Sequence, residues 1–164
     1  MDYSEADLVQ NLSEEIPNTI IFKYETVEIQ NGSPAMQIKA DKAEVYDSKE
    51  ETHLSQVDFY NYEDGEINNH GRSNSAVLYM KSGDAQLTGS IKIESTEDNS
   101  SLRAESIYWI DEKKILSSDP EDTVLVRDKE GSELTGQGFS ADIKRKTITF
   151  DSKIKGVFIS NEKE

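Results

Sequence analysis

A short pattern returns along this chain about every 32 residues. It consists of a hydrophobic residue, one spacer and a very small residue, followed by further apolar positions and a polar turn. The small residues are Ala40, Gly71, Ala104 and Gly136, so successive copies lie 31, 33 and 32 residues apart. Repetition at a period of roughly 20–50 residues is typical of stacked supersecondary units. One such unit cannot bury its own apolar face, and the pattern therefore predicts a core that forms between stacked neighbours.

Within the repeats, apolar residues recur at every second position. Ile20, Phe22 and Tyr24 alternate with polar residues, and so do Val27 and Ile29. This period of two indicates strands with one buried face, because successive side chains of a strand point to opposite sides.

Turn sequences separate the apolar runs. Asn31-Gly32 and Asp64-Gly65 are strong hairpin signals, because both central positions of a two-residue hairpin turn need a positive φ. Other predicted turns lie at 47–50, 82–84, 111–114, 129–131 and 144–146. Many short strands joined by such turns predict an all-β fold with antiparallel neighbours, a sandwich, barrel or roll. We expect a single β domain over residues 17–164.

The first 16 residues differ from the rest. Ser4 has the chemistry of a helix cap, and Leu8, Val9 and Leu12 follow it at helical spacing. Pro17 ends this pattern. We therefore expect residues 1–16 to form an N-terminal segment with a short helix.

The composition excludes several classes of protein. The net charge is −15, which argues against binding to nucleic acid or to an anionic membrane surface. Residues 1–64 hold 15 acidic and 4 basic residues, and the acidic excess favours either a solvated surface or a face for a basic partner. Cysteine is absent, so that disulfides and thiolate metal sites are impossible. No run approaches the roughly 18 apolar residues of a membrane span.

Catalytic motifs are also missing from the sequence. The two histidines, His53 and His70, do not have metal-ligand spacing, and no nucleophile elbow, phosphate loop or zinc-protease motif occurs. Gly136-Gln137-Gly138 lacks the rest of a dinucleotide motif and indicates close backbone packing instead. We expect no enzyme activity, no cofactor and no metal. A carbohydrate-active enzyme on a jelly roll would require clustered carboxylates in a cleft.

The alternating strands gather a set of apolar residues on one face of the predicted roll. In a closed roll they would form a dry core, as in a self-assembling structural or adhesion protein without a lipid ligand. In an open roll they would line a groove for acyl chains, with the small repeat residues leaving room. The set consists of Ile38, Leu54, Val57, Phe59, Leu87, Ile91, Leu102, Val124, Val126, Leu134, Ile148 and Phe158.

Several segments resemble, in the same order, the motifs of one known family. They are 38–46, 85–93, 102–106, 117–120, 124–126, 134–142 and 155–158. Their sequences are similar to those of the LptC proteins, which export lipopolysaccharide in Gram-negative bacteria. The similarity runs from about residue 17 to residue 159 and depends on the order and spacing of the motifs.

The resemblance implies a curved antiparallel β-jellyroll of the OstA-like type, open at its ends. In such a roll Leu54, Ile148 and Phe158 correspond to positions that face the lipid groove. The last strand, predicted over 147–159, corresponds to the edge that is offered to a partner. The edge residues are Thr147, Ile148, Thr149, Phe150, Val157, Phe158 and Ile159.

The same resemblance implies a place in the cell and a set of partners. LptC-like proteins are periplasmic and are anchored to the inner membrane by an N-terminal segment, which is not among these 164 residues. They accept lipopolysaccharide or a related glycolipid from an inner-membrane ABC transporter and pass it to an LptA-like bridge protein. The joining is strand addition at sheet edges, which also permits edge-to-edge self-association.

Overall fold

The computed structural model describes residues 16–159, and every regular element in that part of the chain is a β-strand. The predicted N-terminal segment with its helix, residues 1–16, lies outside the described residues except for Ile16. The described part contains no helix that is long and apolar enough to cross a membrane. The expectation of an all-β fold is therefore confirmed for residues 16–159.

The first six strands are long and the later ones are short. The long strands are β1 (Thr19–Gln30), β2 (Ser33–Tyr46), β3 (Glu51–Glu63), β4 (Glu66–Tyr79), β5 (Ala85–Ser95) and β6 (Ser101–Ile110). The short strands are β7 (Ile115–Ser117), β8 (Thr123–Arg127), β9 (Glu133–Gln137), β10 (Ser140–Asp142), β11 (Thr147–Thr149) and β12 (Ser152–Val157). All pairings between them are antiparallel, and together they make one sheet.

The two strongest turn signals form the hairpins they predict. Asn31 and Gly32 join β1 to β2 with φ angles of 51° and 80°. Asp64 and Gly65 join β3 to β4 with φ angles of 52° and 80°. Positive φ at both positions matches the right-handed twist of the flanking strands, which explains the residue choice. The other predicted turns also lie between consecutive strands.

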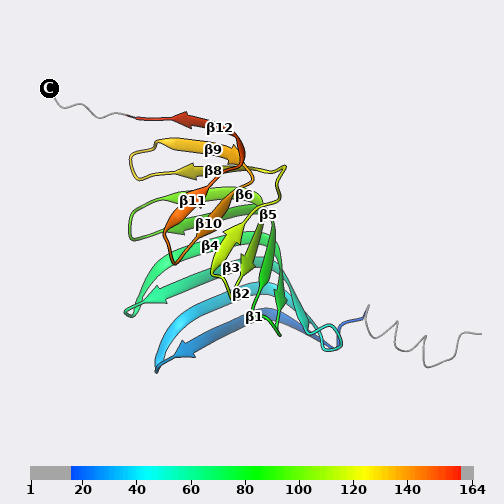
Figure 1. Ribbon diagram of the computed structural model, residues 1–164. Coiled ribbons are helices and arrows are strands. Elements are labelled where there is room, and N and C mark those ends of the chain that lie inside the picture. Colours follow the sequence, from blue (N-terminus) through cyan, green and yellow to red (C-terminus); the bar gives the residue numbers. More distant parts are fainter. Residues whose placement is uncertain (1–15, 160–164) are drawn as a thin grey trace, which may run out of the picture.

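The sheet stacks β1 to β6 in chain order and then divides (Figure 1). One end of β6 pairs with β7, which continues to β10 and β11. The other end of β6 pairs with β8, which continues to β9 and β12. We call the half of the sheet that ends in β12 wall A, and the half that ends in β11 wall B. The two walls share the long strands, each of which runs from one wall into the other.

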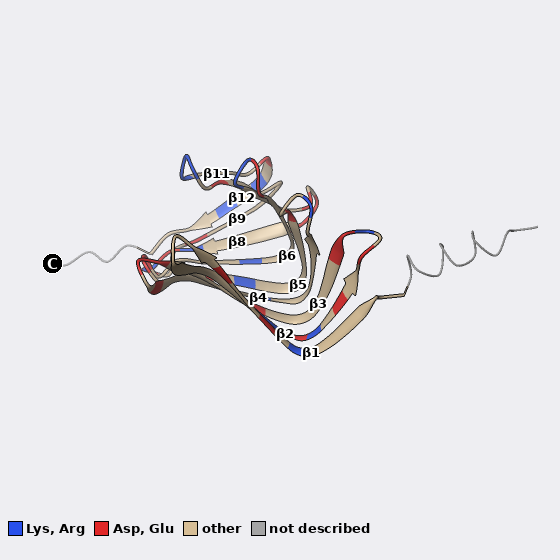
Figure 2. Cartoon of the chain, turned by 90° about the horizontal axis from the view of Figure 1, so that it is seen from below, with Lys and Arg blue, Asp and Glu red and all other residues tan. Residues whose placement is uncertain are grey.

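A row of local irregularities bends the long strands between the walls (Figure 2). Lys23, Gln56 and Ser90 lie on alternate strands at this row and have φ angles of 54°, 53° and 46°. At the same level Gly89 and Ser90 of β5 face the single residue Glu105 of β6, which is the arrangement of a β-bulge. Bulges bend a strand and increase its twist. The bend is therefore set by residues in the strands rather than by turns.

The bend also changes which residues point inward. On β3 the buried side chains of Leu54 and Val57 are three residues apart, and so are those of Ala104 and Ile107 on β6. A regular strand would bring every second side chain to one face. The step of three keeps both halves of each strand facing the same interior, and it places two consecutive residues on the outer side of the bend.

The core lies between the two walls and takes residues from both. Its fully enclosed members are Ala40, Ala43, Leu54, Val57, Ala76, Leu87, Ile91, Ala104, Ile107, Val124, Phe139 and Ala141. Burial of such side chains stabilises the fold by roughly 1.5–3 kcal/mol for each large aliphatic residue. The walls are thus joined by one shared apolar cluster.

The two glycines of the 32-residue repeat do not leave open room, contrary to the expectation. A Cβ at Gly71 would overlap the ring of Phe59, and one at Gly136 would come within 2.5 Å of the ring of Phe150. The space beside both glycines is therefore occupied by a phenylalanine. The repeat does correspond to structural units. Its four small residues lie on β2, β4, β6 and β9, so that each hairpin unit adds one copy.

The stretch 147–159 is not one strand, contrary to the prediction. β11 pairs with β10 on wall B, whereas β12 pairs with β9 on wall A. Between them Phe150 turns inward, where its ring centroid lies 5.5 Å from that of Phe139. The burial of this aromatic side chain explains why the chain crosses between the walls instead of continuing as a strand.

Candidate functional site

A line of apolar side chains crosses wall A from strand to strand, and we call it the apolar row. Its members stand opposite one another in the pairing register of seven neighbouring strands. They are Ile38, Phe59, Gly71, Ile93, Leu102, Val126 and Leu134. Neighbouring strands lie about 4.8 Å apart, so the row spans about 29 Å.

The apolar row is partly open to solvent. Its side chains, Gly71 excepted, are only half-buried, and Ile38, Phe59, Ile93, Leu102 and Val126 pack against the enclosed core. The core lies deeper toward the bend, so the row forms its outer boundary on wall A. Its apolar surface is therefore available to another apolar molecule.

Wall B presents a matching set of side chains. Leu78 and Leu116 are half-buried and pack against the same core. Trp109 stands opposite Leu116 in the register, and Ala141 follows Leu116 on the next strand. The interior is thus bounded by apolar side chains on both walls.

The side chain of Trp109 is held in place by the turn that follows β6. Its indole Nε1 donates a hydrogen bond of 3.3 Å to Asp111 Oδ1, and the ammonium of Lys114 lies 5.6 Å from the ring centroid. Lys114 also donates a 2.7 Å hydrogen bond to Asp111, and this bond lowers the pKa of the Asp111 carboxyl. These contacts fix the ring through polar groups at the rim of wall B.

Two residues farther from the bend, the inward positions on three strands of wall A are polar, whereas β2 has Met36 at this level. Asn61, Asn69 and Ser95 take this place on β3, β4 and β5, and they stand opposite one another in the register. Amide and hydroxyl groups can donate and accept hydrogen bonds without fixing a charge. On β3, β4 and β5 the interior is therefore amphipathic, with an apolar floor and an uncharged polar rim.

The twelve residues predicted to line a groove fall into three places. Five are fully enclosed in the core: Leu54, Val57, Leu87, Ile91 and Val124. Five belong to the apolar row: Ile38, Phe59, Leu102, Val126 and Leu134. The remaining two, Ile148 and Phe158, lie at the C-terminal end of the sheet with exposed fractions of 54% and 80%.

Sequence reasoning missed several residues of this interior. Ile93 is a full member of the apolar row, two positions after Ile91 on β5, and the alternation itself could have found it. Leu78, Trp109 and Leu116 lie on wall B. They were missed because the sequence pattern does not predict that both halves of a bent strand face the same interior.

Within residues 16–159, three edge strands at the two ends of the sheet have one unpaired side. β1 pairs with β2 alone, and at the other end β12 and β11 each have one partner (Figure 1). Both ends carry exposed apolar residues, Phe22 on β1 and Phe158 after β12 among them. Residues 143–159 contain five basic residues against one acidic residue, in a chain whose net charge is −15. The C-terminal end is therefore a basic edge on an acidic protein.

The histidines make local contacts on strands. His53 Nε2 lies 2.9 Å from Glu51 Oε1, and His70 Nε2 lies 3.1 Å from Asp58 Oδ1. Among residues 16–159, no group of three or more histidine or carboxylate side chains is arranged to hold a metal ion.

The fold matches that of a solved transport protein. The chain superimposes on the crystal structure of LptH from Pseudomonas aeruginosa, described as the LptA-homologous periplasmic component of the conserved lipopolysaccharide transport device, with a TM-score of 0.58. The match covers 76% of this chain and 95% of LptH at 16% sequence identity. A comparison with curated proteins gave no match. The fold is thus a curved, open β-jellyroll of the kind seen in that periplasmic component, as the resemblance implied.

The sequence also matches a family model, described as lipopolysaccharide-assembly, LptC-related, over residues 2–159. The chain therefore belongs to the LptC-related family of lipopolysaccharide-assembly proteins. Because this family transports lipopolysaccharide and does not catalyse a reaction, the expectation that the chain is not an enzyme is confirmed.

Proposed function

We propose that this protein is a periplasmic transfer module that carries lipopolysaccharide, or a related outer-membrane glycolipid, along its apolar row. It would accept the lipid from an inner-membrane ABC transporter and pass it to an LptA-like bridge protein. The observation that carries the proposal is the continuity of the row, which crosses seven strands without a charged side chain. Family membership supports the same function.

The spacing of the row suits a moving acyl chain. Each strand offers an apolar side chain about 4.8 Å from the next, so the contacts at one position are replaced by similar contacts at the following position. Each buried methylene contributes about 0.8 kcal/mol wherever it lies along such a path. A polar rim without fixed charge at Asn61, Asn69 and Ser95 would let the sugar end move along with the acyl chains.

The two edges give this path a direction. At the C-terminal end Ile148 extends wall B, and the ring of Phe158 lies over Gly156, which stands opposite Leu134 of the apolar row. We propose that β12 and β11 pair there with the LptA-like partner, and that β1 faces the transporter side. Unpaired backbone groups at a sheet edge favour strand addition. The same chemistry supports self-association of copies end to end.

The family also supports two proposals about organisation. We propose an N-terminal anchor in the inner membrane, with residues 1–16 leading to a single β-jellyroll domain over residues 17–164. The enclosed core that joins both walls supports the single domain, because neither wall buries its apolar face alone.

Photo-crosslinking tests the lipid path. A photoreactive amino acid at Phe59, Leu102 or Val126 should capture lipopolysaccharide, because these side chains face the interior and are half-exposed. The matched controls are the neighbours Tyr60, Ser101 and Arg127, which lie on the same strands and face outward. The readout is a lipid adduct on the purified protein.

The pattern of labelling decides between the lipid path and a dry structural roll. Equal labelling of inward and outward positions would contradict the proposed path. If no adduct forms and native mass spectrometry finds no bound lipid, the chain would be a self-assembling structural roll without a lipid ligand.

A further inference from the structure

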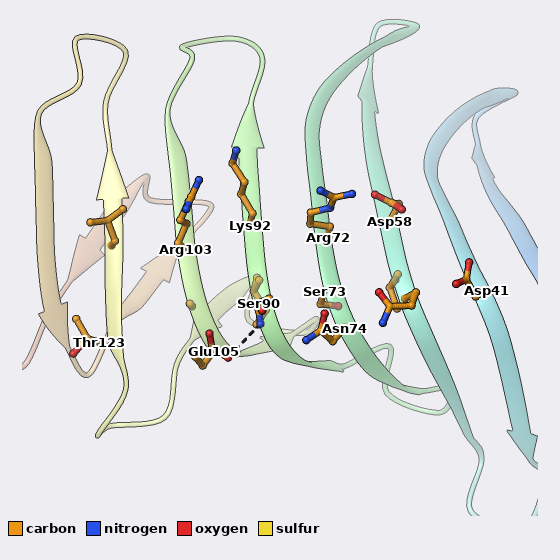
Figure 3. A pocket seen from close by; sticks show the side chains of 15 residues that line it. Asp41, Asp58, Arg72, Ser73, Asn74, Ser90, Lys92, Arg103, Glu105 and Thr123 are labelled. Carbon is orange, nitrogen blue, oxygen red and sulfur yellow. Dashed lines mark hydrogen bonds between the residues drawn. The ribbon is translucent and has the colours of Figure 1, made fainter.

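Three basic side chains stand in line on the outer face of wall A, and we call them the cation row. Arg72 on β4 stands opposite Lys92 on β5, which stands opposite Arg103 on β6. Each lies next to an inward-facing residue of its strand, so the cation row faces away from the apolar row. Figure 3 shows the three side chains next to one another on neighbouring strands.

This arrangement is unfavourable for the sheet by itself. Like charges directly opposite each other on neighbouring strands destabilise the pairing. Lys92 is neutralised by Glu94 at 2.7 Å, but within residues 16–159 no carboxylate forms a salt bridge with Arg72 or Arg103. Asp58 stands opposite Arg72, yet its carboxylate contacts His70 at 3.1 Å. The chain has 33 acidic residues and 18 basic ones. The two unpaired arginines therefore do not result from a shortage of carboxylates.

The cation row borders a cleft of about 720 Å³ at the bend of the sheet (Figure 3). At the bend, two consecutive residues of a strand point outward. There the bulged residues of β5 also interrupt the regular pairing with β6, and the cleft lies over this interruption. Ser90 N donates a 3.2 Å hydrogen bond to the carboxylate of Glu105 in place of a strand partner. A volume of this size lies within the range of roughly 300–1,000 Å³ that small-molecule sites occupy.

The remaining lining of the cleft contains no cation, and it combines polar residues with the apolar Val57, Ile91, Ala104 and Leu125. Asn74, Ser90 and Thr123 contribute amide and hydroxyl groups, and Asp41, Asp58 and Glu105 contribute carboxylates. A ligand must therefore place negative charge at the cation row and uncharged hydrogen-bonding groups near the bend. An extended polyanion would meet the three carboxylates as well as a net charge of −15, which disfavours nucleic acid and an anionic membrane surface.

We propose that this outer cleft binds a small anionic saccharide, with its phosphate or carboxylate on Arg72 and Arg103 and its hydroxyl groups toward Asn74, Ser90 and Thr123. A guanidinium holds such an oxyanion with two parallel hydrogen bonds. The site lies on the face opposite to the apolar row and does not depend on the proposed lipid path.

Titration followed by amide chemical shifts tests the proposal, with glucose 6-phosphate as the probe and glucose and inorganic phosphate as comparisons. We expect saturable shifts at Arg72, Ser90 and Arg103 with glucose 6-phosphate, no saturation with glucose, and weaker binding of inorganic phosphate. Added NaCl should weaken the binding, because the charges are exposed. The double variant Arg72→Gln/Arg103→Gln should bind at least about tenfold more weakly, since two charge-assisted contacts are lost.

The control variant is Lys113→Gln, which removes a positive charge in the turn after β6 and should leave binding unchanged. The double variant should melt no lower than the parent protein, because it removes a like-charge contact. Absence of saturable shifts, equal binding by the double variant, or insensitivity to NaCl would overturn the site. Equal binding of inorganic phosphate would overturn its assignment to a saccharide. None of these results depends on lipid capture by the apolar row.

Discussion

The fit between Phe59 and Gly71 shows how single residues keep the interior continuous. Phe59 belongs to the apolar row, and its ring covers the backbone of Gly71 on the next strand. A larger residue at position 71 would displace the ring, while a smaller one at position 59 would leave a gap in the row. The glycine is therefore explained by the close approach of the ring.

We predict that Gly71→Ala lowers the free energy of unfolding by about 1–3 kcal/mol, because the new methyl group overpacks against the ring of Phe59. Urea denaturation followed by circular dichroism measures the change. In a Phe59→Leu background, where the ring is absent, the same Gly71→Ala substitution should lower the free energy of unfolding by less than it does in the parent protein. Additive effects of the two substitutions would show that the ring is not the obstacle.

The contact between Asp111 and Lys114 makes part of the stability depend on pH. The hydrogen bond from Lys114 lowers the pKa of Asp111 below its ordinary value of 3.8. A depressed folded-state pKa stabilises the fold above the unfolded-state pKa, and this contribution is lost as the pH falls through the folded value. The loss therefore occurs below about pH 4.

We predict that Asp111→Asn melts at a lower temperature than the parent protein at pH 7, and that the difference shrinks as the pH falls toward 3. Thermal melts across this range provide the measurement. The matched control is Asp64→Asn in the β3–β4 turn. A difference between Asp111→Asn and the parent that stays constant with pH would exclude the proposed contribution of the ion pair.

At the scale of elements, the two ends of the sheet differ in charge. The stretch 143–159, which includes β11 and β12, holds five basic residues and one acidic residue, whereas β1 at the other end holds one basic and two acidic residues. A basic edge attracts a partner edge of opposite charge and speeds its approach, while the main-chain bonds supply much of the affinity.

We predict that Lys153→Glu/Lys155→Glu slows association with the LptA-like protein of the same organism by about tenfold at low salt. The effect should shrink between about 50 and 500 mM NaCl, because salt screens exposed charges. Surface plasmon resonance gives the rates. Lys49→Glu/Lys113→Glu makes the same charge change in turns away from this edge and should have a smaller effect. Equal slowing by both variants would indicate a dependence on net charge alone.

At the scale of the whole molecule, the bend turns a single sheet into two walls with one core. Ile107 on wall B and Val124 on wall A are both fully enclosed in the same cluster. Neither wall can lose its packing without exposing apolar side chains of the other. The walls should therefore unfold together.

We predict that Ile107→Ala lowers the stability by about 2–5 kcal/mol. Fluorescence of Trp109, the single tryptophan, reports on wall B, and far-ultraviolet circular dichroism reports on all strands. The two transitions should coincide in the parent and shift by the same amount in the variant. A shift of the fluorescence transition alone would show that the walls unfold separately and would contradict the single domain.

The sequence by itself determined the strands, the hairpins and the family. Alternation fixes which residues share a face of one strand, and Asn31-Gly32 and Asp64-Gly65 specify their turns by backbone conformation, so these are local properties. The five predicted residues of the apolar row were found in this way. Ile93 was within reach of the same rule.

Only the tertiary structure decided how these strands are bent and with which strands the C-terminal stretch pairs. The burial of Leu54 and Val57 three positions apart depends on a bulge that is shared with neighbouring strands. The division of 147–159 into β11 and β12 depends on the packing of Phe150 against Phe139, which no local pattern contains. Likewise, the cation row exists because the pairing register brings together residues that are 11 to 20 positions apart in the chain. Local conformation follows from neighbouring residues, whereas the walls, the edges and the outer cleft follow from contacts between distant ones.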